Sequence, residues 1–230
     1  MKRTRDHVFA MLFGVSRALT HTYRYSTVPC TRPENVAEHS HWVTFYSWVI
    51  ATLFQQRHPD EQVDMAELLQ QAMLHDVDEA VTGDFLRGVK YKLRGLKDLL
   101  EQVAADGMQE VSAQLGLDIQ AAWSRAKGPG FEGAVVRTAD LCGVVAYMAE
   151  EVALGNAILR LRCDGTRTYL QEWRDKLADY PGLSTAQIEF LTEVVDACIG
   201  AIEQVGAGHG ASLFHGLARV TGPSDVPTQS

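Results

Sequence analysis

Residues 74–84 read LHDVDEAVTGD and place an imidazole, His75, directly beside a carboxylate, Asp76, at the end of a helical pattern. Two further residues of the same kinds lie far from this stretch, His39 in the string EHS and Asp140 in the string TADLCG. Together the four offer a ligand set for one divalent metal ion that leaves positions open for water and substrate. Such an ion acidifies a bound water and promotes hydrolysis at neutral pH.

All four side chains lie on apolar faces of predicted helices, so they are expected to point inward together. The apolar neighbours at helical spacing are Val36, Val43, Tyr46 and Ile50 for His39, then Leu68, Leu69 and Ala72 for His75 and Asp76, and Val136, Val144 and Tyr147 for Asp140. Taken singly, an inward histidine is more often a hydrogen-bonded core residue, and Asp76 could cap a helix. A buried Asp140, however, needs a cation or several donors. The combination favours a metal site.

Composition and charge narrow the class of protein. The chain has 230 residues, 46% of them hydrophobic, which fits one domain with a sizeable core. A net charge of −8 argues against a nucleic-acid polymer or an acidic membrane as partner. The four cysteines show no CxxC pairing and are expected to be reduced thiols in a cytoplasmic protein. No apolar run is long enough to span a membrane.

Helical periodicity dominates and predicts a single all-α domain over residues 1–205, followed by a flexible C-terminal tail over residues 206–230. The stretch between Val77 and Lys90 contains two glycines and predicts a loop or short turns. Helices are expected over about residues 3–20, 34–58, 64–76, 91–115, from before Asp140 to about 154, 166–178 and 184–205.

Several longer strings extend the pattern of the four residues. RPENVAEHS (residues 32–40), HDVDEAVTGD (75–84), VKY (89–91) and Ala139-Asp140 together resemble the H…HD…D signature of the HD-domain metal-dependent phosphohydrolases, and within it the bacterial 5′-deoxynucleotidases. The resemblance covers about residues 8–160. It implies an HD-domain helical bundle, a homodimer or higher homo-oligomer, and one divalent metal ion (Co²⁺, Mn²⁺, Zn²⁺ or Fe²⁺) held by His39, His75, Asp76 and Asp140.

The resemblance also implies an activity. Members of this family hydrolyse the 5′-phosphate of deoxyribonucleoside monophosphates, whereas related viral enzymes release triphosphate from deoxynucleoside triphosphates, in some cases preferring dATP. We therefore expect a deoxynucleotide substrate and a 5′-deoxynucleotidase, with a triphosphohydrolase as the alternative. A non-catalytic metal-binding regulatory module is a further alternative, but it would be expected to lack a proton-transfer acid.

Glu79 is that acid by its match to the family. It lies three residues beyond Asp76, so it could face the same cavity, and Asp76 is expected to act in catalysis as well as in metal binding. The opposing interpretation makes Glu79 a solvated member of an acidic run. Asp78 is expected to be the solvent-facing member of that run.

Substrate contacts are carried over from the same match. Arg24 matches an arginine that contacts the nucleotide, and Asp84 resembles the residue that accepts a hydrogen bond from the 3′-hydroxyl, although a turn aspartate after a glycine is equally in keeping with its surroundings. Arg87 and Lys90 belong to a basic cluster, together with Lys92 and Arg94, that could attract phosphate.

Two departures from the family pattern fall where selectivity would be set. Tyr25 stands where the bacterial enzymes carry a tryptophan after the arginine, and a tyrosine ring can still stack on a base with less area. Residues 85–88 read FLRG where the family usually has a proline-containing turn. The extra cations near this turn mildly favour room for a longer phosphate chain, so the choice between mono- and triphosphate stays open.

Overall fold

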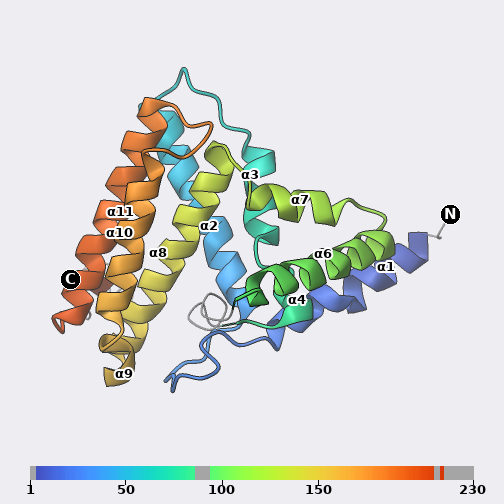
Figure 1. The fold of residues 1–230 in the computed structure, drawn as a ribbon, viewed down its shortest axis with the longest axis horizontal. Coiled ribbons are helices and arrows are strands. Elements are labelled where there is room, and N and C mark those ends of the chain that lie inside the picture. Colours follow the sequence, from blue (N-terminus) through green and yellow to red (C-terminus); the bar gives the residue numbers. More distant parts are fainter. Residues whose placement is uncertain (1–3, 86–93, 210–212, 215–230) are drawn as a thin grey trace, which may run out of the picture.

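The computed structural model describes residues 4–85, 94–209 and 213–214, and these residues form helices joined by short turns (Figure 1). The helices are α1 (Thr4–Phe13), the 3₁₀ helix η1 (Val15–Thr20), α2 (Val36–Arg57), α3 (Met65–Leu74), α4 (Glu79–Thr82), α6 (Leu96–Leu115), α7 (Ile119–Ala126), α8 (Phe131–Ala153), α9 (Ala157–Arg160), α10 (Cys163–Leu177) and α11 (Thr185–Gly206). The described part of the chain contains no strand, only one isolated bridge between Tyr23 and Asn35. The all-α prediction is confirmed.

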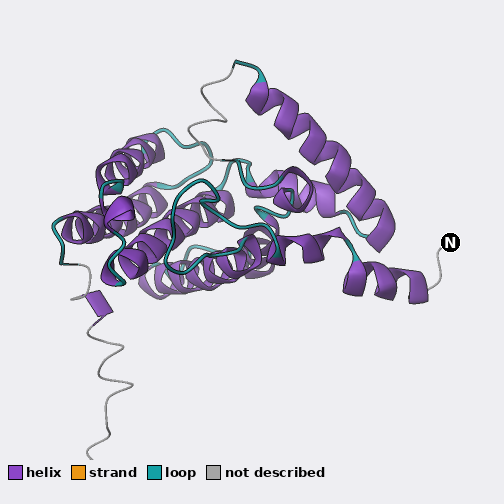
Figure 2. Ribbon diagram, turned by 90° about the horizontal axis from the view of Figure 1, so that it is seen from below, coloured by secondary structure: helices purple, strands orange, loops and turns teal. Residues whose placement is uncertain are grey.

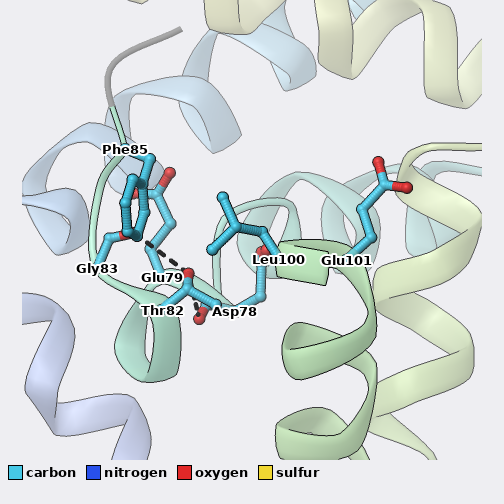
Figure 3. A pocket seen from close by; sticks show the side chains of 7 residues that line it. All are labelled: Asp78, Glu79, Thr82, Gly83, Phe85, Leu100 and Glu101. Carbon is cyan, nitrogen blue, oxygen red and sulfur yellow. Dashed lines mark hydrogen bonds between the residues drawn. The ribbon is translucent and has the colours of Figure 1, made fainter. Parts of the chain in front are cut away.

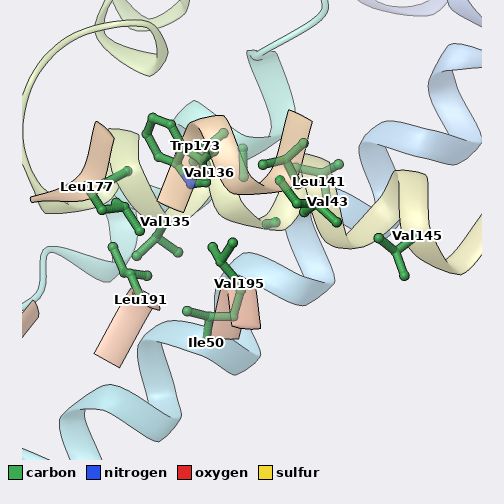
Figure 4. Close-up of a cluster of buried hydrophobic side chains, with 14 of the residues drawn as sticks. Val43, Ile50, Val135, Val136, Leu141, Val145, Trp173, Leu177, Leu191 and Val195 are labelled. Atoms are coloured by element: carbon green, nitrogen blue, oxygen red, sulfur yellow. The ribbon is translucent and has the colours of Figure 1, made fainter. Parts of the chain in front are cut away.

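The long helices α2, α8, α10 and α11 pack side by side and form what we call the large lobe, on the left of Figure 1. Its core is built from aliphatic and aromatic side chains at helical spacing, such as Val43, Val135 and Leu191, which are all fully buried (Figure 4). Burial of apolar surface at roughly 25 cal/mol per Å² is the main force that holds such a bundle together. The lobe thereby provides a rigid frame.

A second, smaller core joins η1, α4, α6 and α7, which we call the small lobe together with α1. Met108 of α6 and Trp123 of α7 are buried here against Val77, which follows α3. Helix α3 packs against α2 and α8 as well as α7, so it connects the two lobes (Figure 2 shows the bundle from below). The HD segment at the end of α3 is therefore positioned by both cores.

Side-chain caps explain where the helices that carry the site begin. The Asn35 side chain accepts a hydrogen bond from Glu38 N at 2.9 Å and starts α2, and Asp64 accepts one from Glu67 N at 3.0 Å and starts α3. Each bond satisfies one of the amides that a helix N-terminus leaves without an internal partner. The caps set the register that turns His39 and His75 inward.

Three expectations about the elements were wrong in detail. The helix predicted over residues 3–20 breaks at Gly14, where a Cβ would lie 2.0 Å from the carbonyl oxygen of Ala10, and continues as the 3₁₀ turn η1. Helix α7 was not predicted, because its apolar residues cluster in eight positions, too few for a clear periodicity. Helix α10 begins at Cys163 rather than near residue 166.

The C-terminal region and the cysteines were also the subject of predictions. Most of the predicted tail lies outside the described residues, and α11 ends at Gly206. All four cysteines are free, although the sulfur atoms of Cys142 and Cys198 lie 3.4 Å apart between α8 and α11. Across residues 4–85, 94–209 and 213–214, no helix combines the length and the apolar character that crossing a membrane requires.

Candidate metal and nucleotide site

The four residues singled out from the sequence converge at the junction of the lobes. His39 comes from α2, His75 and Asp76 from the turn that ends α3, and Asp140 from α8. His39 Nε2 lies 3.2 Å from Asp140 Oδ1 and 3.7 Å from Asp76 Oδ2, and His75 Nε2 lies 3.0 Å from the same Asp76 oxygen. Donor atoms of His39, His75 and Asp76 all lie within 4.8 Å of one another, a spacing that could hold a metal ion.

The two imidazoles are buried and their Nε2 atoms have no hydrogen-bond partner. His75 Nδ1 lies 2.8 Å from the carbonyl oxygen of Ala72 and donates a hydrogen bond to it, so in the neutral imidazole Nε2 keeps a free lone pair. A buried nitrogen without a partner is costly unless something else binds it. This unsatisfied pair, aimed at two carboxylates, fits a metal ion.

Close packing of α8 against His39 depends on a glycine. A Cβ at Gly143 would lie 3.1 Å from His39 Cε1 and 3.2 Å from His39 Nδ1, closer than side chains normally approach. The helix can therefore run directly behind the imidazole and present Asp140, one turn earlier, to the same point. Gly143 was quoted in the sequence only as part of a string, because its role depends on the packing of two distant helices.

The electrostatics of the cluster suit a cation. Burial, followed by the positive Arg24, lowers the pKa of His39 to about 4, so its imidazole is neutral at pH 7. Burial opposes ionisation of Asp76 and Asp140, but His75 beside Asp76 and His39 beside Asp140 outweigh it and hold both pKa values below their usual range. Neutral nitrogen and ionised oxygen donors are the forms that bind divalent metals.

Arg137 was not expected to contribute to the site. Arg137 lies one helical turn before Asp140 on α8. Its guanidinium Nη1 donates a hydrogen bond to Asp140 Oδ2 at 2.8 Å. Because Oδ2 is held in this way, Asp140 turns its other oxygen, Oδ1, toward His39.

Arg24 and Tyr25 lie on a loop before α2 that approaches the cluster. Arg24 pairs with the buried Glu34 at 3.4 Å, and although burial opposes its charge, the carboxylates of Asp140, Glu34 and Asp76 raise its pKa. The backbone N–H of Tyr25 donates to Asp84 Oδ2 at 3.2 Å. The structure thus brings Asp84 to the neighbouring pair Arg24 and Tyr25, 59 residues earlier in the sequence.

Tyr25 is held in an uncommon conformation. Its φ of +56° lies in the left-handed region, and its ring stacks on Tyr147 of α8 with centroids 5.2 Å apart and an interplanar angle of 6°. Such backbone conformations persist only where surrounding contacts stabilise them, and they are frequent at ligand sites. Here the stack and the bond to Asp84 are those contacts.

Glu79 begins α4 and lines a small cavity with Thr82, Phe85 and Leu100 (Figure 3). Burial, followed by the negative charges of Asp76 and Asp84, raises its pKa to about 10. A carboxyl that holds its proton at pH 7 beside two ionised carboxylates is suited to proton transfer. The interpretation of Glu79 as a solvated surface acid does not fit this half-buried position.

The expectation that Asp78 faces solvent was wrong. Asp78 is only 8% exposed and accepts hydrogen bonds from Trp123 Nε1 at 2.8 Å and from Lys127 Nζ at 3.3 Å. Trp123 lies on α7 and Lys127 caps its C-terminus, and this helix was not predicted, so the burial of Asp78 could not be inferred from the sequence. Asp78 ties the HD turn to the small lobe.

Arg87, Lys90 and Lys92 lie outside the described residues, so their predicted part in binding phosphate stays a prediction. Arg94, the fourth member of that basic cluster, is described and exposed.

Glu151 was missed entirely by the sequence analysis. This fully buried carboxylate on α8 accepts hydrogen bonds from the backbone N–H groups of Thr31 and Arg32 at 2.7 and 2.6 Å and from Asn156 Nδ2 at 2.7 Å. Burial opposes its ionisation, but these donors outweigh burial and lower its pKa. Glu151 therefore anchors the loop that carries Arg24 and Tyr25; no local signal distinguishes it from its exposed neighbours.

Comparison with known proteins identifies the family of the chain. The family described as 5′-deoxynucleotidase YfbR-like matches residues 11–181. The 5′-deoxynucleotidase YfbR of Salmonella typhi is 28% identical over 168 residues, covering 68% of this chain and 80% of the relative. The Photorhabdus temperata 5′-deoxynucleotidase is 26% identical over 184 residues, covering 75% and 92% of the two chains.

Solved structures share the fold. An HD-domain phosphohydrolase from Listeria innocua superposes with a TM-score of 0.63 at 20% identity, over 91% of this chain and 99% of the other. A cyanophage S-2L HD phosphohydrolase bound to dA and one catalytic Zn²⁺ ion superposes with a TM-score of 0.55 at 17% identity, over 87% and 98%. The fold, the clustered residues and a family match across most of its length show that this chain belongs to the YfbR-like 5′-deoxynucleotidase family.

Proposed function

We propose that this protein is a metal-dependent phosphohydrolase that removes the 5′-phosphate from deoxyribonucleoside monophosphates. One observation carries the proposal: two buried imidazoles with unpartnered Nε2 atoms converge with Asp76 and Asp140, with a proton-holding Glu79 three residues beyond Asp76. Membership of a family of 5′-deoxynucleotidases supports the substrate class.

His39, His75, Asp76 and Asp140 are the residues that would hold one divalent ion. Two nitrogen and two oxygen donors suit Zn²⁺, Mn²⁺, Co²⁺ or Fe²⁺, and the cyanophage neighbour with its catalytic Zn²⁺ supports the first of these. When bound, such an ion activates water as a nucleophile and offsets negative charge on the phosphate.

The protein's own groups complete the reaction. Asp76 stays ionised beside His75 and keeps its oxygens available as acceptors. Glu79 enters the reaction protonated and delivers its proton to the 5′ oxygen as the bond to phosphorus breaks. Arg24, held beside Glu34, faces the anionic phosphate and orients it for attack.

Substrate selection belongs to Tyr25 and Asp84. Tyr25 stacks on the base from the position that its contact with Tyr147 sets. The carboxylate of Asp84, already held against the Tyr25 backbone, accepts a hydrogen bond from the 3′-hydroxyl of the sugar. Selection against a ribonucleotide then follows from the lack of space for a 2′-hydroxyl beside this fixed carboxylate.

A direct assay tests the proposal. Purified protein with Mn²⁺, Co²⁺ or Zn²⁺ is incubated with dAMP, AMP and dATP, and the products are resolved by chromatography. We expect deoxyadenosine and phosphate from dAMP, with AMP left largely intact. Triphosphate released from dATP, with dAMP untouched, would replace the proposal with a triphosphohydrolase; no metal-dependent activity on any of the three would favour a binding module.

We propose that the protein forms a homodimer through the outward face of α2. Trp42, Phe45 and Trp48 are 40%, 44% and 47% exposed on this face, and their rings contact one another in series. Residues 39–56 contain no Asp, Glu, Lys or Arg, so the face is uncharged over more than four turns. An uncharged aromatic surface fits a second copy of itself about a two-fold axis.

Light scattering coupled to size-exclusion chromatography tests the dimer. Trp48→Glu should convert it to a monomer, whereas Leu161→Glu, at a position that is 80% exposed and outside this face, should not. A monomeric wild-type protein would contradict the proposal.

The four free cysteines further support a reducing, cytoplasmic location, which fractionation of cells that produce the protein would test.

A further inference from the structure

A cavity borders the cluster, and neither Tyr25 nor Asp84 is among the residues that line it. The cavity has a volume of about 250 Å³ and lies between the end of α3, α7, α8 and α10. The described residues that line it include the cluster residues His75, Asp76 and Asp140, the cations Lys127 and Arg137, and the ring of Trp173. Three of them are proposed metal ligands, so a molecule in this cavity would lie beside the phosphate that reacts in the proposed function.

Two cations line this cavity, and each is positioned by a carboxylate. Lys127 Nζ lies 3.3 Å from Asp78 Oδ2 and 4.0 Å from the centre of the Trp123 ring. Arg137 Nη1 lies 2.8 Å from Asp140 Oδ2. An ammonium has three N–H donors and a guanidinium has five, so both keep donors free after these contacts.

The charge of the lining depends on the metal. Lys127 and Arg137 balance Asp76 and Asp140, so the four side chains sum to zero. Asp78, which pairs with Lys127, adds one negative charge behind this lining, so one divalent ion at the cluster would leave these groups with an excess of one positive charge. An anion is therefore the ligand that this cavity would take in the loaded protein.

The opposite wall is fixed in place. Trp173 Nε1 donates to Thr138 Oγ1 at 3.1 Å, and Tyr180 OH donates to the carbonyl oxygen of Gly128 at 2.8 Å. The two rings also pack edge to face, with centroids 5.4 Å apart. Because both polar ends are occupied, these rings form a rigid wall and leave Lys127 and Arg137 as the polar recognition groups.

We propose that this cavity is a subsite for a second phosphate oxyanion, bound by Lys127 and Arg137 beyond the phosphate that reacts. The proposal rests on the proposed function, because phosphohydrolysis at the cluster supplies such an oxyanion in two ways. It belongs either to the β- and γ-phosphates of a deoxynucleoside triphosphate or to inorganic phosphate leaving after hydrolysis. Both present the same doubly charged oxyanion to the two cations.

Binding and kinetics on one variant separate these sources. Inorganic triphosphate and inorganic phosphate are titrated calorimetrically into metal-loaded wild-type protein and Lys127→Gln. Loss of one charge-assisted contact should weaken binding about tenfold. If the triphosphate is the source, Lys127→Gln also raises KM for dATP about tenfold and leaves KM for dAMP within about twofold. If the product is the source, it weakens inhibition of dAMP hydrolysis by phosphate instead.

Two further variants serve as controls. Arg125→Gln removes a cation from the same helix that pairs with Glu67 outside the cavity, and it should leave binding of both anions unchanged. Lys127→Arg keeps the charge and should restore binding, whereas a merely structural role through Asp78 would make Lys127→Gln lower the melting temperature without changing anion affinity.

The subsite is overturned if both anions bind Lys127→Gln and wild type equally, or if Arg125→Gln weakens them as much. Failure of the subsite and failure of the proposed function remain distinct. If wild type hydrolyses dAMP and Lys127→Gln binds both anions normally, the subsite is wrong and the proposed function stands. Lys127-dependent anion binding by a protein that hydrolyses nothing would keep the site as a phosphate-binding pocket.

Discussion

The clustered side chains and the loop that carries Arg24 and Tyr25 are held in place by different means. His39, His75 and Asp140 project from long helices or helix ends whose apolar faces pack into the large core, and His39 is fully buried. The loop that carries Arg24 and Tyr25 is held by hydrogen bonds to side chains, above all to Glu151 and Asp84. Helix packing leaves little freedom, whereas a few hydrogen bonds can be changed without loss of the fold.

This difference separates two kinds of variant. Changes in the cluster should remove activity and metal together, while changes in the loop should alter affinity for the substrate and local stability. The departures from the family pattern at Tyr25 and residues 85–88 fall on the loop side. Selectivity can therefore diverge within the family while the helices keep the cluster intact.

The largest effect is expected from the cluster. His39→Gln should lower kcat for dAMP at least about a thousandfold and reduce bound metal, because one of two nitrogen donors is lost. Metal content by atomic spectroscopy and steady-state kinetics check this. His41→Gln, two residues along the same helix and exposed, is the matched control and should keep both metal and activity. Equal losses in both variants would contradict the assignment of His39.

Glu79→Gln should come next. We expect kcat to fall about a hundredfold or more while bound metal stays at the wild-type level, because a proton-transfer group is lost and no ligand is. Glu101→Gln changes an exposed acid that lines the same small cavity and should have little effect. Loss of metal from Glu79→Gln would make the residue a ligand rather than a proton donor.

A smaller effect is expected from the loop anchor. Glu151→Gln replaces an acceptor of three hydrogen bonds with an amide that turns a donor toward the loop, and should cost about 2 kcal/mol in unfolding free energy. KM for dAMP should rise more than kcat falls, because the loop carries Arg24 and Tyr25. Urea denaturation and steady-state kinetics measure both effects.

The neighbouring Glu150→Gln is the control for that change. Glu150 forms an exposed ion pair with Arg32, and such surface pairs contribute about 0–1 kcal/mol to the free energy of unfolding. If Glu150→Gln matched Glu151→Gln in both stability and KM, the loop would not be anchored by the buried carboxylate.

A loss of stability on acidification should be about as large as the loss at the loop anchor. The folded-state pKa of His39 is about 4, below the ordinary 6.5, so the unfolded chain binds a proton at this residue first as pH falls. Acidification therefore destabilises the folded protein. The contribution of His39 to the free energy of unfolding is complete above pH 6.5 and is lost between pH 6.5 and pH 4. At pH 5 the loss corresponds to about 2 kcal/mol at 1.36 kcal/mol per pH unit.

Comparison with the His39→Gln protein isolates this contribution. The free energy of unfolding of both proteins is measured with a chelator present. From pH 7 to pH 5, wild type should lose about this amount of stability relative to the variant. Titration of His75, whose pKa is raised because the Asp76 carboxylate outweighs burial, is common to both proteins and cancels. A difference that does not change with pH would show that His39 titrates normally.

Much of the structure was accessible from the sequence because it depends on local periodicity. Val36, Val43 and Ile50 recur at helical spacing around His39, so its inward direction could be predicted before any contact was known. The same spacing placed His75, Asp76 and Asp140 on inner faces. Helix α7 was missed because two helical turns carry too little periodicity, and the break at Gly14 that separates α1 from η1 was not predicted.

The sequence by itself determined the all-α class and the residues that could bind a metal, since helix faces and ligand chemistry are properties of residue type and spacing. Only the tertiary structure decided that Asp78 is buried against α7, that Glu151 anchors a loop 119 residues away, and that Lys127 and Arg137 share one cavity with the cluster. These contacts join distant segments, and nothing local to either partner encodes such a meeting, because it follows from how the two cores pack.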